Sequence, residues 1–254
     1  MTPLVLVHGL MGGSRQWQGQ IEALSGVECI ALDLPGFGEN ADAARLRNID
    51  GFAAWALEAL SARGVTQFHL LGHSMGGMVA QQMVALAPSR VMSLVLYGTG
   101  AQGVLPGRFE TIETSKERAQ AEGAQATARR IAATWFLECE NAPAFEVCAQ
   151  IAQASSIDAI LGGLDAMNGW SGTAHLARIT APTLVICGDH DRTYSWEQTQ
   201  ALWRGIAGAD LAVLPRCSHA AHLEKPALFN AVLQSFLRDQ SSGRMISNTS
   251  RTAV

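Results

Sequence analysis

The hydrophobic residues of this chain are concentrated in short runs that alternate with longer segments of mixed character. Most of these runs are continuously apolar, which is the pattern of strands that are buried on both faces. Their alternation with helical segments predicts an α/β fold, in which a mostly parallel sheet of about six strands is covered by helices on both faces. The expected strands are Leu4–Val7, Cys29–Leu32, 68–71, Val91–Tyr97, 182–188 and 209–214.

Several of the intervening segments carry apolar residues at helical spacing. The clearest is Ile49–Ala62. Met75–Leu86 is also expected to be a helix, because it is rich in apolar residues and contains no internal proline. Ser14 is expected to cap a short helix that carries Trp17. Further helices are expected at 196–206 and 226–238.

The alternation of strand and helix stops after Gly103. About 75 residues follow without a convincing strand, which is far longer than an ordinary loop. We therefore expect a helical lid at 104–178, inserted between core segments 1–103 and 179–240, and a flexible tail at 241–254. Within the insertion, helices are expected at 110–122, 126–137 and 144–155.

The sequence Gly72-His73-Ser74-Met75-Gly76 lies between an expected strand and an expected helix. A Gly-x-Ser-x-Gly motif in this context predicts a sharp turn on which the serine stands clear of the sheet as a nucleophile. The two glycines have no Cβ, so the neighbouring backbones can approach closely. A glycine-rich turn can also contain a serine that has no chemical role, so this motif needs partners elsewhere in the chain.

A serine nucleophile needs a base, a group that orients the base, and donors for the developing oxyanion. Past the insertion, the loop after the expected fifth strand carries Asp189 and Asp191. The loop after the last strand carries His219, with His222 close behind. Because the carboxyl ends of parallel strands meet at one edge of a sheet, both loops can converge on Ser74.

The motifs that carry a family resemblance are His8-Gly9, Asp33-Leu34-Pro35-Gly36-Phe37-Gly38, the elbow at 72–77, Gly188-x-x-Asp191, and His219 followed by Glu224-Lys225-Pro226. With these motifs the chain resembles the α/β-hydrolase superfamily over nearly its whole length, in its branch of serine carboxylesterases and carbon–carbon bond hydrolases. The resemblance implies that Ser74 is the nucleophile, His219 the general base and Asp191 the orienting acid. It also implies that the backbone N–H groups of Leu10 and Met75 bind the oxyanion.

Two alternatives stay open within this assignment. Asp189 could orient the base in place of Asp191, although its position is typical of a turn residue whose carboxylate caps nearby N–H groups. His222 could replace His219, although the family spacing to Glu224 favours His219.

Residues that contact substrate are harder to select. Trp17, Trp135, Trp170 and His222 are candidates to line the pocket, but each is equally suited to a core position. The Arg129-Arg130 pair in the insertion could contact a substrate carboxylate or form a solvated helix face.

The resemblance implies a serine hydrolase that cleaves small carboxylic esters through an acyl-enzyme intermediate, without a cofactor or a metal. The same residues are similar to those of carbon–carbon bond hydrolases, enol-lactonases, cofactor-free haloperoxidases and the small lyase of menaquinone synthesis. Some proteins with this fold are instead small-ligand receptors without catalysis. The sequence does not separate these classes, because pocket shape sets substrate choice.

The composition of the chain indicates which kinds of binding partner are not expected. The 254 residues carry a net charge of −4 and no basic cluster, so a nucleic-acid surface is not expected. The odd number of cysteines, five, predicts reduced thiols rather than a disulfide framework. No apolar run is long enough to span a bilayer and the N-terminus lacks the features of a signal peptide, so we expect no membrane partner and a cytoplasmic location. The oligomeric state is not indicated.

Overall fold

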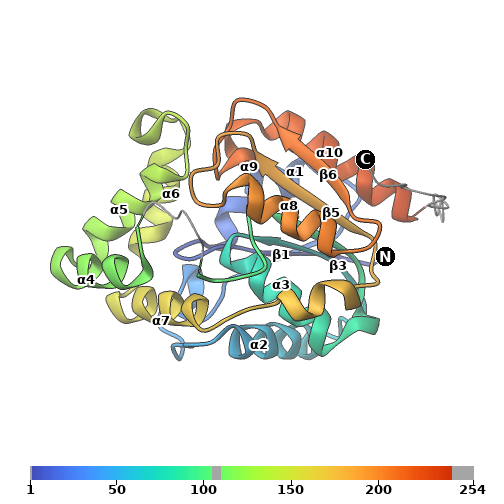
Figure 1. Cartoon of the computed structure of the whole chain (residues 1–254), viewed down its shortest axis with the longest axis horizontal. Helices are drawn as coiled ribbons and strands as arrows, with labels where there is room; N and C mark the ends of the chain where they lie inside the picture. The colour runs from blue at the N-terminus through green and yellow to red at the C-terminus, as the bar shows by residue number, and fades with distance from the viewer. Residues whose placement is uncertain (1, 105–109, 242–254) are drawn as a thin grey trace.

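The computed structural model describes residues 2–104 and 110–241, and a parallel sheet lies at its centre (Figure 1). Within these residues six strands pair in the order β2-β1-β3-β4-β5-β6, and every neighbouring pair is parallel. The expected parallel sheet is thereby confirmed. Residues 105–109 of the expected lid and 242–254 of the expected tail lie outside the described residues. The strands are β1 (Leu4–Val7), β2 (Cys29–Leu32), β3 (Phe68–His73), β4 (Val91–Tyr97), β5 (Thr183–Gly188) and β6 (Asp210–Leu214).

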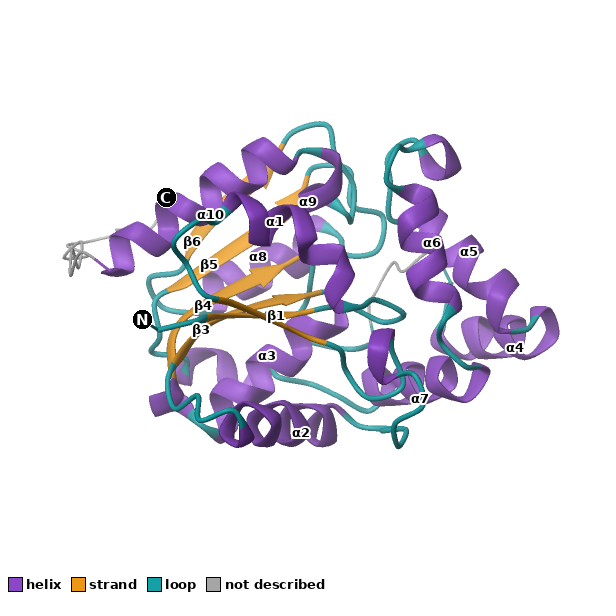
Figure 2. Cartoon of the chain, turned by 180° about the vertical axis from the view of Figure 1, so that it is seen from behind, coloured by secondary structure: helices purple, strands orange, loops and turns teal. Residues whose placement is uncertain are grey.

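The side chains of the central strands alternate between two hydrophobic clusters, one on each face of the sheet. In β1, Val5 and Val7 belong to one cluster, whereas Leu4 and Leu6 belong to the other. This alternation follows from the two-residue repeat of a strand. One face is covered by α2 (Ile49–Ala62), α3 (Met75–Leu86) and α8 (Trp196–Gly205), and the other by α1 (Gln18–Ala23) and α10 (Pro226–Ser241) (Figure 2).

The chain between β4 and β5 forms a separate group of helices. The strand arrowheads in Figure 2 point toward this group, so it lies beyond the carboxyl ends of the strands. It therefore occupies the place where a lid over a strand-end site would lie. Its helices are α4 (Ile112–Glu122), α5 (Ala124–Thr134), α6 (Phe145–Gln153) and α7 (Ile157–Asn168).

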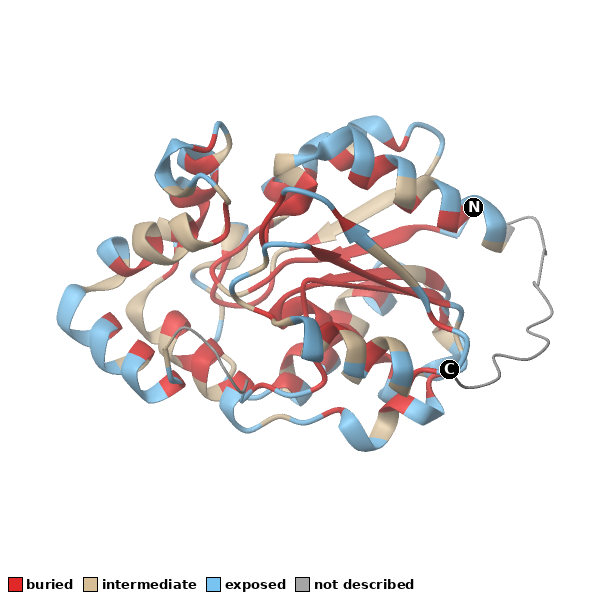
Figure 3. Ribbon diagram, turned by 45° about the horizontal axis from the view of Figure 1, so that its top comes forward, coloured by how far each residue is buried: buried red, intermediate tan, exposed pale blue. Residues whose placement is uncertain are grey.

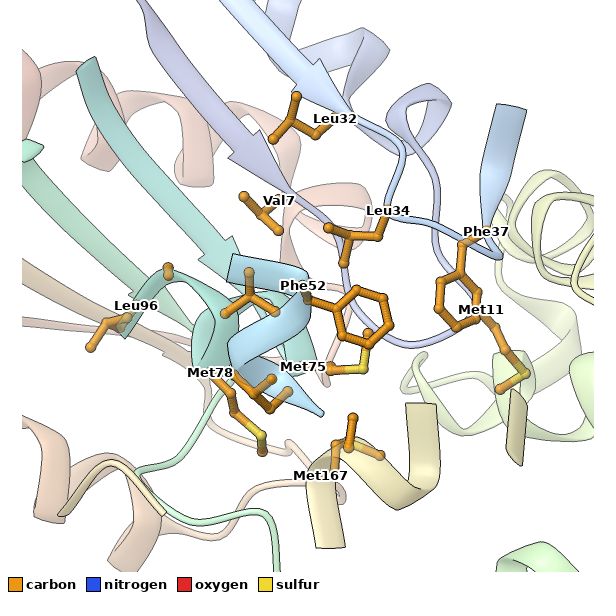
Figure 4. Close-up of a cluster of buried hydrophobic side chains, with 14 of the residues drawn as sticks. Val7, Met11, Leu32, Leu34, Phe37, Phe52, Met75, Met78, Leu96 and Met167 are labelled. Atoms are coloured by element: carbon orange, nitrogen blue, oxygen red, sulfur yellow. The ribbon is translucent and has the colours of Figure 1, made fainter. Parts of the chain in front are cut away.

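The hydrophobic core is continuous from the sheet into this helical group. The four central strands are buried along most of their length, whereas the edge strands β2 and β6 are largely half-buried or exposed (Figure 3). Exposed residues also lie on the outer surfaces of the helices. Phe52 of α2 lies beside Met75 of α3, with Met167 of α7 in the same cluster (Figure 4). Burying one side chain of this size stabilises the fold by about 1.5–3 kcal/mol, so the contacts of α7 attach the group firmly to the core.

The sequence pattern does not predict α7, because Gly162 and Gly163 reduce its helix propensity. The structure shows why glycine stands at these positions. A Cβ on Gly163 would lie 2.3 Å from Leu10 Cδ1, and a Cβ on Gly162 would lie 2.8 Å from the Leu46 carbonyl oxygen. The two glycines therefore allow α7 to pack closely against the loops of the core.

Two other local expectations are corrected. Helix α5 ends at Thr134 rather than at residue 137, and the Leu137 N–H is bonded to Glu224 Oε1 at 2.6 Å instead of to a helical carbonyl. Ser14 is not a cap, since Gly13 occupies the cap position of the short 3₁₀ helix η1 (Ser14–Trp17).

Candidate active site

Ser74 stands on a sharp turn between β3 and α3. Its backbone angles, φ 56° and ψ −124°, are rarely adopted by residues other than glycine. The Ser74 N–H donates to the Tyr97 carbonyl at 3.0 Å, and Thr99 Oγ1 donates to the Ser74 carbonyl at 2.7 Å. Bonds from β4 and the loop after it therefore hold the strained residue in place.

The glycines on either side of Ser74 are required by close backbone contacts. A Cβ on Gly72 would lie 2.3 Å from the Gly76 carbonyl oxygen. A Cβ on Gly76 would lie 2.4 Å from the carbonyl oxygens of both Val7 and His8. The close approach expected from the sequence motif is thus confirmed.

His219 and Asp191 come from the loops after β6 and β5, and their side chains are joined. His219 Nδ1 lies 2.9 Å from Asp191 Oδ2, and both side chains are only 2% exposed. Asp191 Oδ1 accepts the N–H groups of Thr193 and Tyr194 at 2.8 and 3.1 Å, which fixes the carboxylate. Because the carboxylate accepts from Nδ1–H, the opposite nitrogen, Nε2, is left as the basic atom of the neutral ring.

A cavity of about 40 Å³ lies at this edge of the sheet, and both Ser74 and His219 line it. A single water needs about 10–15 Å³, so the cavity holds roughly three groups of that size. Trp135 and Met167 line it from the helical group. Among the described residues no hydrogen bond joins the Ser74 hydroxyl to the His219 ring, so the two residues line the same cavity without being bonded to each other.

The loop after β1 is held tightly against Ser74. A Cβ on Gly9 would lie 2.8 Å from Ser74 Cβ. His8 Nε2 accepts the Leu34 N–H at 2.9 Å, so the ring carries its proton on Nδ1 and donates it to the Gly9 carbonyl at 2.7 Å. Burial lowers the pKa of His8, which keeps the ring neutral in this role.

The two backbone N–H groups expected to bind an oxyanion belong to segments that adjoin Ser74. Met75 is the first residue of α3, and the first N–H groups of a helix have no partner within the helix. Leu10 follows Gly9 and lines the cavity. Both expected donors therefore belong to segments next to the candidate nucleophile.

Neutral polar rings pack behind His219. His73 Nε2 and the Tyr97 hydroxyl both donate to the His219 carbonyl, at 3.0 and 2.8 Å. Burial lowers the pKa of His73 well below its usual value and that of His222 to about 3, and the neighbouring histidines add to both shifts. These groups stay uncharged and fix the backbone that carries the His219 ring.

Of the four candidate substrate-contacting side chains, only Trp135 lines the cavity. Trp17 is fully buried on the α1–α10 face, where the centroids of its ring and of the His222 ring are 4.7 Å apart. Trp170 donates from Nε1 to Gln82 Oε1 at 3.4 Å. The placement of Trp17, Trp170 and His222 thus agrees with the alternative reading of these residues as packing positions.

The cavity also contains residues that the sequence did not single out. Tyr194 stacks on His219 with ring centroids 5.6 Å apart, and its place three residues after Asp191 is the only local signal for it. Met167 and Gln16 line the cavity as well. Met167 had no usable signal, because the helix that carries it is not predicted.

Asp189 has a structural position outside the cavity. Its Oδ1 accepts the Cys217 N–H at 3.2 Å and lies 2.7 Å from His190 Nδ1. The carboxylate therefore closes the turns after β5 and β6, as expected for the alternative turn role.

Within residues 2–104 and 110–241, no group of three or more His, Cys, Asp or Glu could hold a metal ion. In the same residues no single helix is both long and apolar enough to cross a membrane, and α6 and α7 reach that length and composition only as a pair bent by 98°.

Known proteins share this architecture. The sequence profile of the alpha/beta hydrolase fold family matches residues 2–226. A protein of Variovorax paradoxus named putative carbamate hydrolase RutD is 30% identical, over 92% of this chain and 91% of its own. A crystal structure of a hydrolase from Pseudomonas aeruginosa PA01 has a TM-score of 0.83 at 28% identity, over 93% of this chain and 90% of that one. A malate-bound thermophilic esterase from Thermogutta terrifontis has a TM-score of 0.85 at 26% identity, over 94% and 90% of the two chains.

A parallel sheet with a serine on a sharp turn at its carboxyl edge is the architecture of the α/β hydrolases. The chain belongs to the α/β-hydrolase fold family, which confirms the resemblance read from its motifs. Membership supports hydrolase activity on a small-molecule substrate.

Proposed function

We propose that this protein is a serine hydrolase that cleaves small carboxylic esters through an acyl-enzyme intermediate. The observation that carries the proposal is that strained Ser74 and His219 line one cavity, while Asp191 is bonded to the His219 ring. Strained backbone persists only where the surrounding structure enforces it, and such strain is concentrated at active sites. The likeness to a thermophilic esterase adds support.

The proposed reaction begins when Ser74 Oγ attacks the ester carbonyl and His219 Nε2 takes its proton. Asp191 keeps the Nδ1–H tautomer and stabilises the charge on the ring. The N–H groups of Leu10 and Met75 bind the carbonyl oxygen as it becomes negative, and each such donor lowers the barrier by about 3–4 kcal/mol.

The intermediate then collapses, the bond from carbon to the leaving oxygen breaks, and His219 gives its proton to the leaving alcohol. Water attacks the acyl group on Ser74 with His219 again as base, and the carboxylic acid is released. The separation of Ser74 from His219 is compatible with this scheme, because catalytic hydrogen bonds often tighten only in the substrate complex.

We further propose that residues 104–178 act as a lid over core segments 1–103 and 179–240. Trp135 and Met167 support this division, since both belong to the insertion and line the cavity that holds Ser74. A lid of this kind excludes water and shapes the pocket.

Carbamate hydrolysis is a second candidate, and the 30% identity to a putative carbamate hydrolase favours it. The same attack by Ser74 would form a carbamoyl-enzyme, and the same base would assist its release. The two candidates differ in the group attached to the carbonyl carbon and not in the roles of the three side chains.

A panel of p-nitrophenyl esters of increasing acyl length, together with a p-nitrophenyl carbamate, tests the proposal. We expect turnover of the short esters, and Ser74→Ala should lower kcat by at least about 10,000-fold, as for other members of a catalytic triad. Ser155→Ala is a suitable control, because Ser155 is a buried serine outside the cavity lining.

Faster cleavage of the carbamate would favour the second candidate. Undiminished ester turnover by Ser74→Ala would contradict both. Absence of turnover together with tight binding of a small ligand would favour a receptor, and cleavage of a vinylogous diketone alone would favour a carbon–carbon bond hydrolase.

A further inference from the structure

A second, smaller cavity lies beside the one that contains Ser74. It measures about 20 Å³ and is enclosed by α4, α5, α7 and the loop after β1. Leu10 and Ile131 line both cavities, so these two side chains stand at the boundary between them. The smaller space suits a single group about the size of a water molecule, for which about 10–15 Å³ is needed.

Two polar atoms of the residues that line this cavity have no hydrogen-bond partner in the described part of the chain. They are Thr127 Oγ1 and Arg130 Nη2, both shielded from solvent, and Thr127 as a whole is 2% exposed. An unpaired buried polar group costs about 1–3 kcal/mol. Two of them at one cavity next to a candidate nucleophile indicate a place for an oxygen atom of a ligand.

The charged groups around Arg130 determine whether a ligand oxygen at this cavity would be charged or neutral. Arg130 pairs with Glu122 at 2.8 Å and with Glu110 at 3.4 Å, and Arg118 pairs with the same two carboxylates. Burial raises the pKa of Glu110, but bonds from Ser115 and the two arginines outweigh burial and leave the pKa below its usual value. Two arginines balance two carboxylates, so the remaining N–H of Arg130 suits an uncharged acceptor.

The neighbouring Arg129 behaves differently. It forms a bidentate pair with Glu146, at 3.0 and 2.8 Å, and both side chains are exposed. Only Arg130 of the two lines the smaller cavity. The solvated helix face expected from the sequence therefore describes Arg129 and not Arg130.

We propose that the smaller cavity is the distal end of the substrate site and binds one uncharged oxygen of the substrate, such as a keto or hydroxyl group. The proposal rests on the ester hydrolysis proposed above. Arg130 Nη2 donates to this oxygen, and Thr127 Oγ1 donates to it or accepts from a hydroxyl. The substrate is then a small ester with a neutral oxygen several bonds from the scissile carbonyl, on the part that passes Leu10 and Ile131.

The test compares kcat/KM for three kinds of p-nitrophenyl ester. One series is unsubstituted, a second carries one keto or hydroxyl group at successive chain positions, and a third ends in a carboxylate. We expect the wild type to prefer the best oxygenated ester over its unsubstituted match by at least about tenfold, because a site built to bond an oxygen disfavours an analogue without it.

Variants of Thr127 and Arg130 test whether these residues cause the preference for the oxygenated ester. Thr127→Val keeps the side-chain shape but removes the hydroxyl, and it should reduce the preference to about threefold or less, as expected for the loss of one hydrogen bond. Arg130→Met should reduce it as well, whereas Thr127→Ser should retain it. Arg129→Met and Ser155→Ala are matched controls, since neither residue lines either cavity, and both should retain the wild-type ratio.

An equal preference in wild type and Thr127→Val would overturn the proposal, as would the lack of any preference or a preference for the carboxylate-ended series. Failure of ester hydrolysis itself would be recognised separately, as no Ser74-dependent turnover of any ester. In that case calorimetric affinities of Ser74→Ala for the same esters decide the question. An affinity ratio that Thr127→Val abolishes supports the distal site, and a ratio of one overturns it.

Discussion

At the carboxyl edge of the sheet, hydrogen bonds fix the direction of the Asp191 carboxylate and the tautomer of the His8 ring. Asp191 receives two backbone N–H groups on one oxygen and faces His219 with the other. His8 is fixed in one tautomer by the Leu34 N–H. The Asp191 carboxylate and the His219 ring are therefore oriented before a substrate arrives, and such preorganisation is the main requirement for electrostatic stabilisation of a transition state.

The orienting role of Asp191 predicts a large effect of a small change. Asp191→Asn should lower kcat on p-nitrophenyl esters by about 10,000-fold, because the amide can donate to His219 Nδ1 and stabilise the wrong tautomer. Asp189→Asn is the matched control, and its kcat should stay within a few-fold of wild type, since Asp189 serves the turn at Cys217. Comparable losses in the two variants would contradict the assignment.

At the scale of secondary-structure elements, the junction of β3 with α3 depends on space that only glycine provides. Gly76→Ala would bring a methyl group to within 2.4 Å of two carbonyl oxygens of the β1 end, so the strand or helix must move. We expect the free energy of unfolding to fall by about 3 kcal/mol, the upper range for overpacking.

Gly19→Ala in α1 is the control for this prediction, because a Cβ there meets no other atom within 4 Å. Alanine favours helix over glycine, so this variant should be more stable by about 0.5–1 kcal/mol. Urea unfolding measures both. A Gly76→Ala protein as stable as wild type would show that the close packing at the elbow is not rigid.

The strands and the helices α2 and α3 could be predicted, because buried parallel strands leave continuous apolar runs, α2 keeps a helical spacing of apolar residues, and α3 is a long apolar segment without proline. The limits of α5 and the existence of α7 could not. Glu224, distant in sequence, takes the Leu137 N–H that a longer helix would use. Gly162 and Gly163 hide a helix whose stability comes from packing rather than from propensity.

At the scale of the whole molecule, buried neutral histidines link folding to pH. Burial holds the pKa of His222 at about 3 and that of His73 well below 6.5 in the folded protein, whereas in the unfolded chain both titrate near 6.5. Between these values the unfolded state binds more protons. The stability is therefore complete above about pH 6.5 and decreases as the pH falls toward 3.

His222 alone should change the free energy of unfolding by up to about 1.4 kcal/mol per pH unit between about pH 3 and 6.5. Urea unfolding at pH 7.5, 5.5 and 4.5 measures it, and His222→Asn should give a shallower dependence because one titrating ring is removed. If the free energy of unfolding depended on pH in the same way in wild type and in His222→Asn, His222 would have to become protonated in the folded state, which contradicts the prediction.

The meeting of Ser74, Asp191 and His219 at one edge could be predicted, since the topology of a parallel sheet brings its strand ends together. The lining contributed by the insertion could not. Two adjacent arginines look alike in the sequence, yet Arg129 pairs at the surface and Arg130 lines the smaller cavity. Which side of a helix in the insertion faces the core is decided by tertiary packing, and local sequence does not encode it.

The most direct test of the central claim is mass spectrometry of the protein quenched in acid during turnover of a slowly hydrolysed p-nitrophenyl ester. We expect one added acyl group, mapped to the peptide that contains Ser74 and absent from Ser74→Ala. An acyl group on a different residue, or turnover by Ser74→Ala at the wild-type rate, would contradict the acyl-enzyme mechanism.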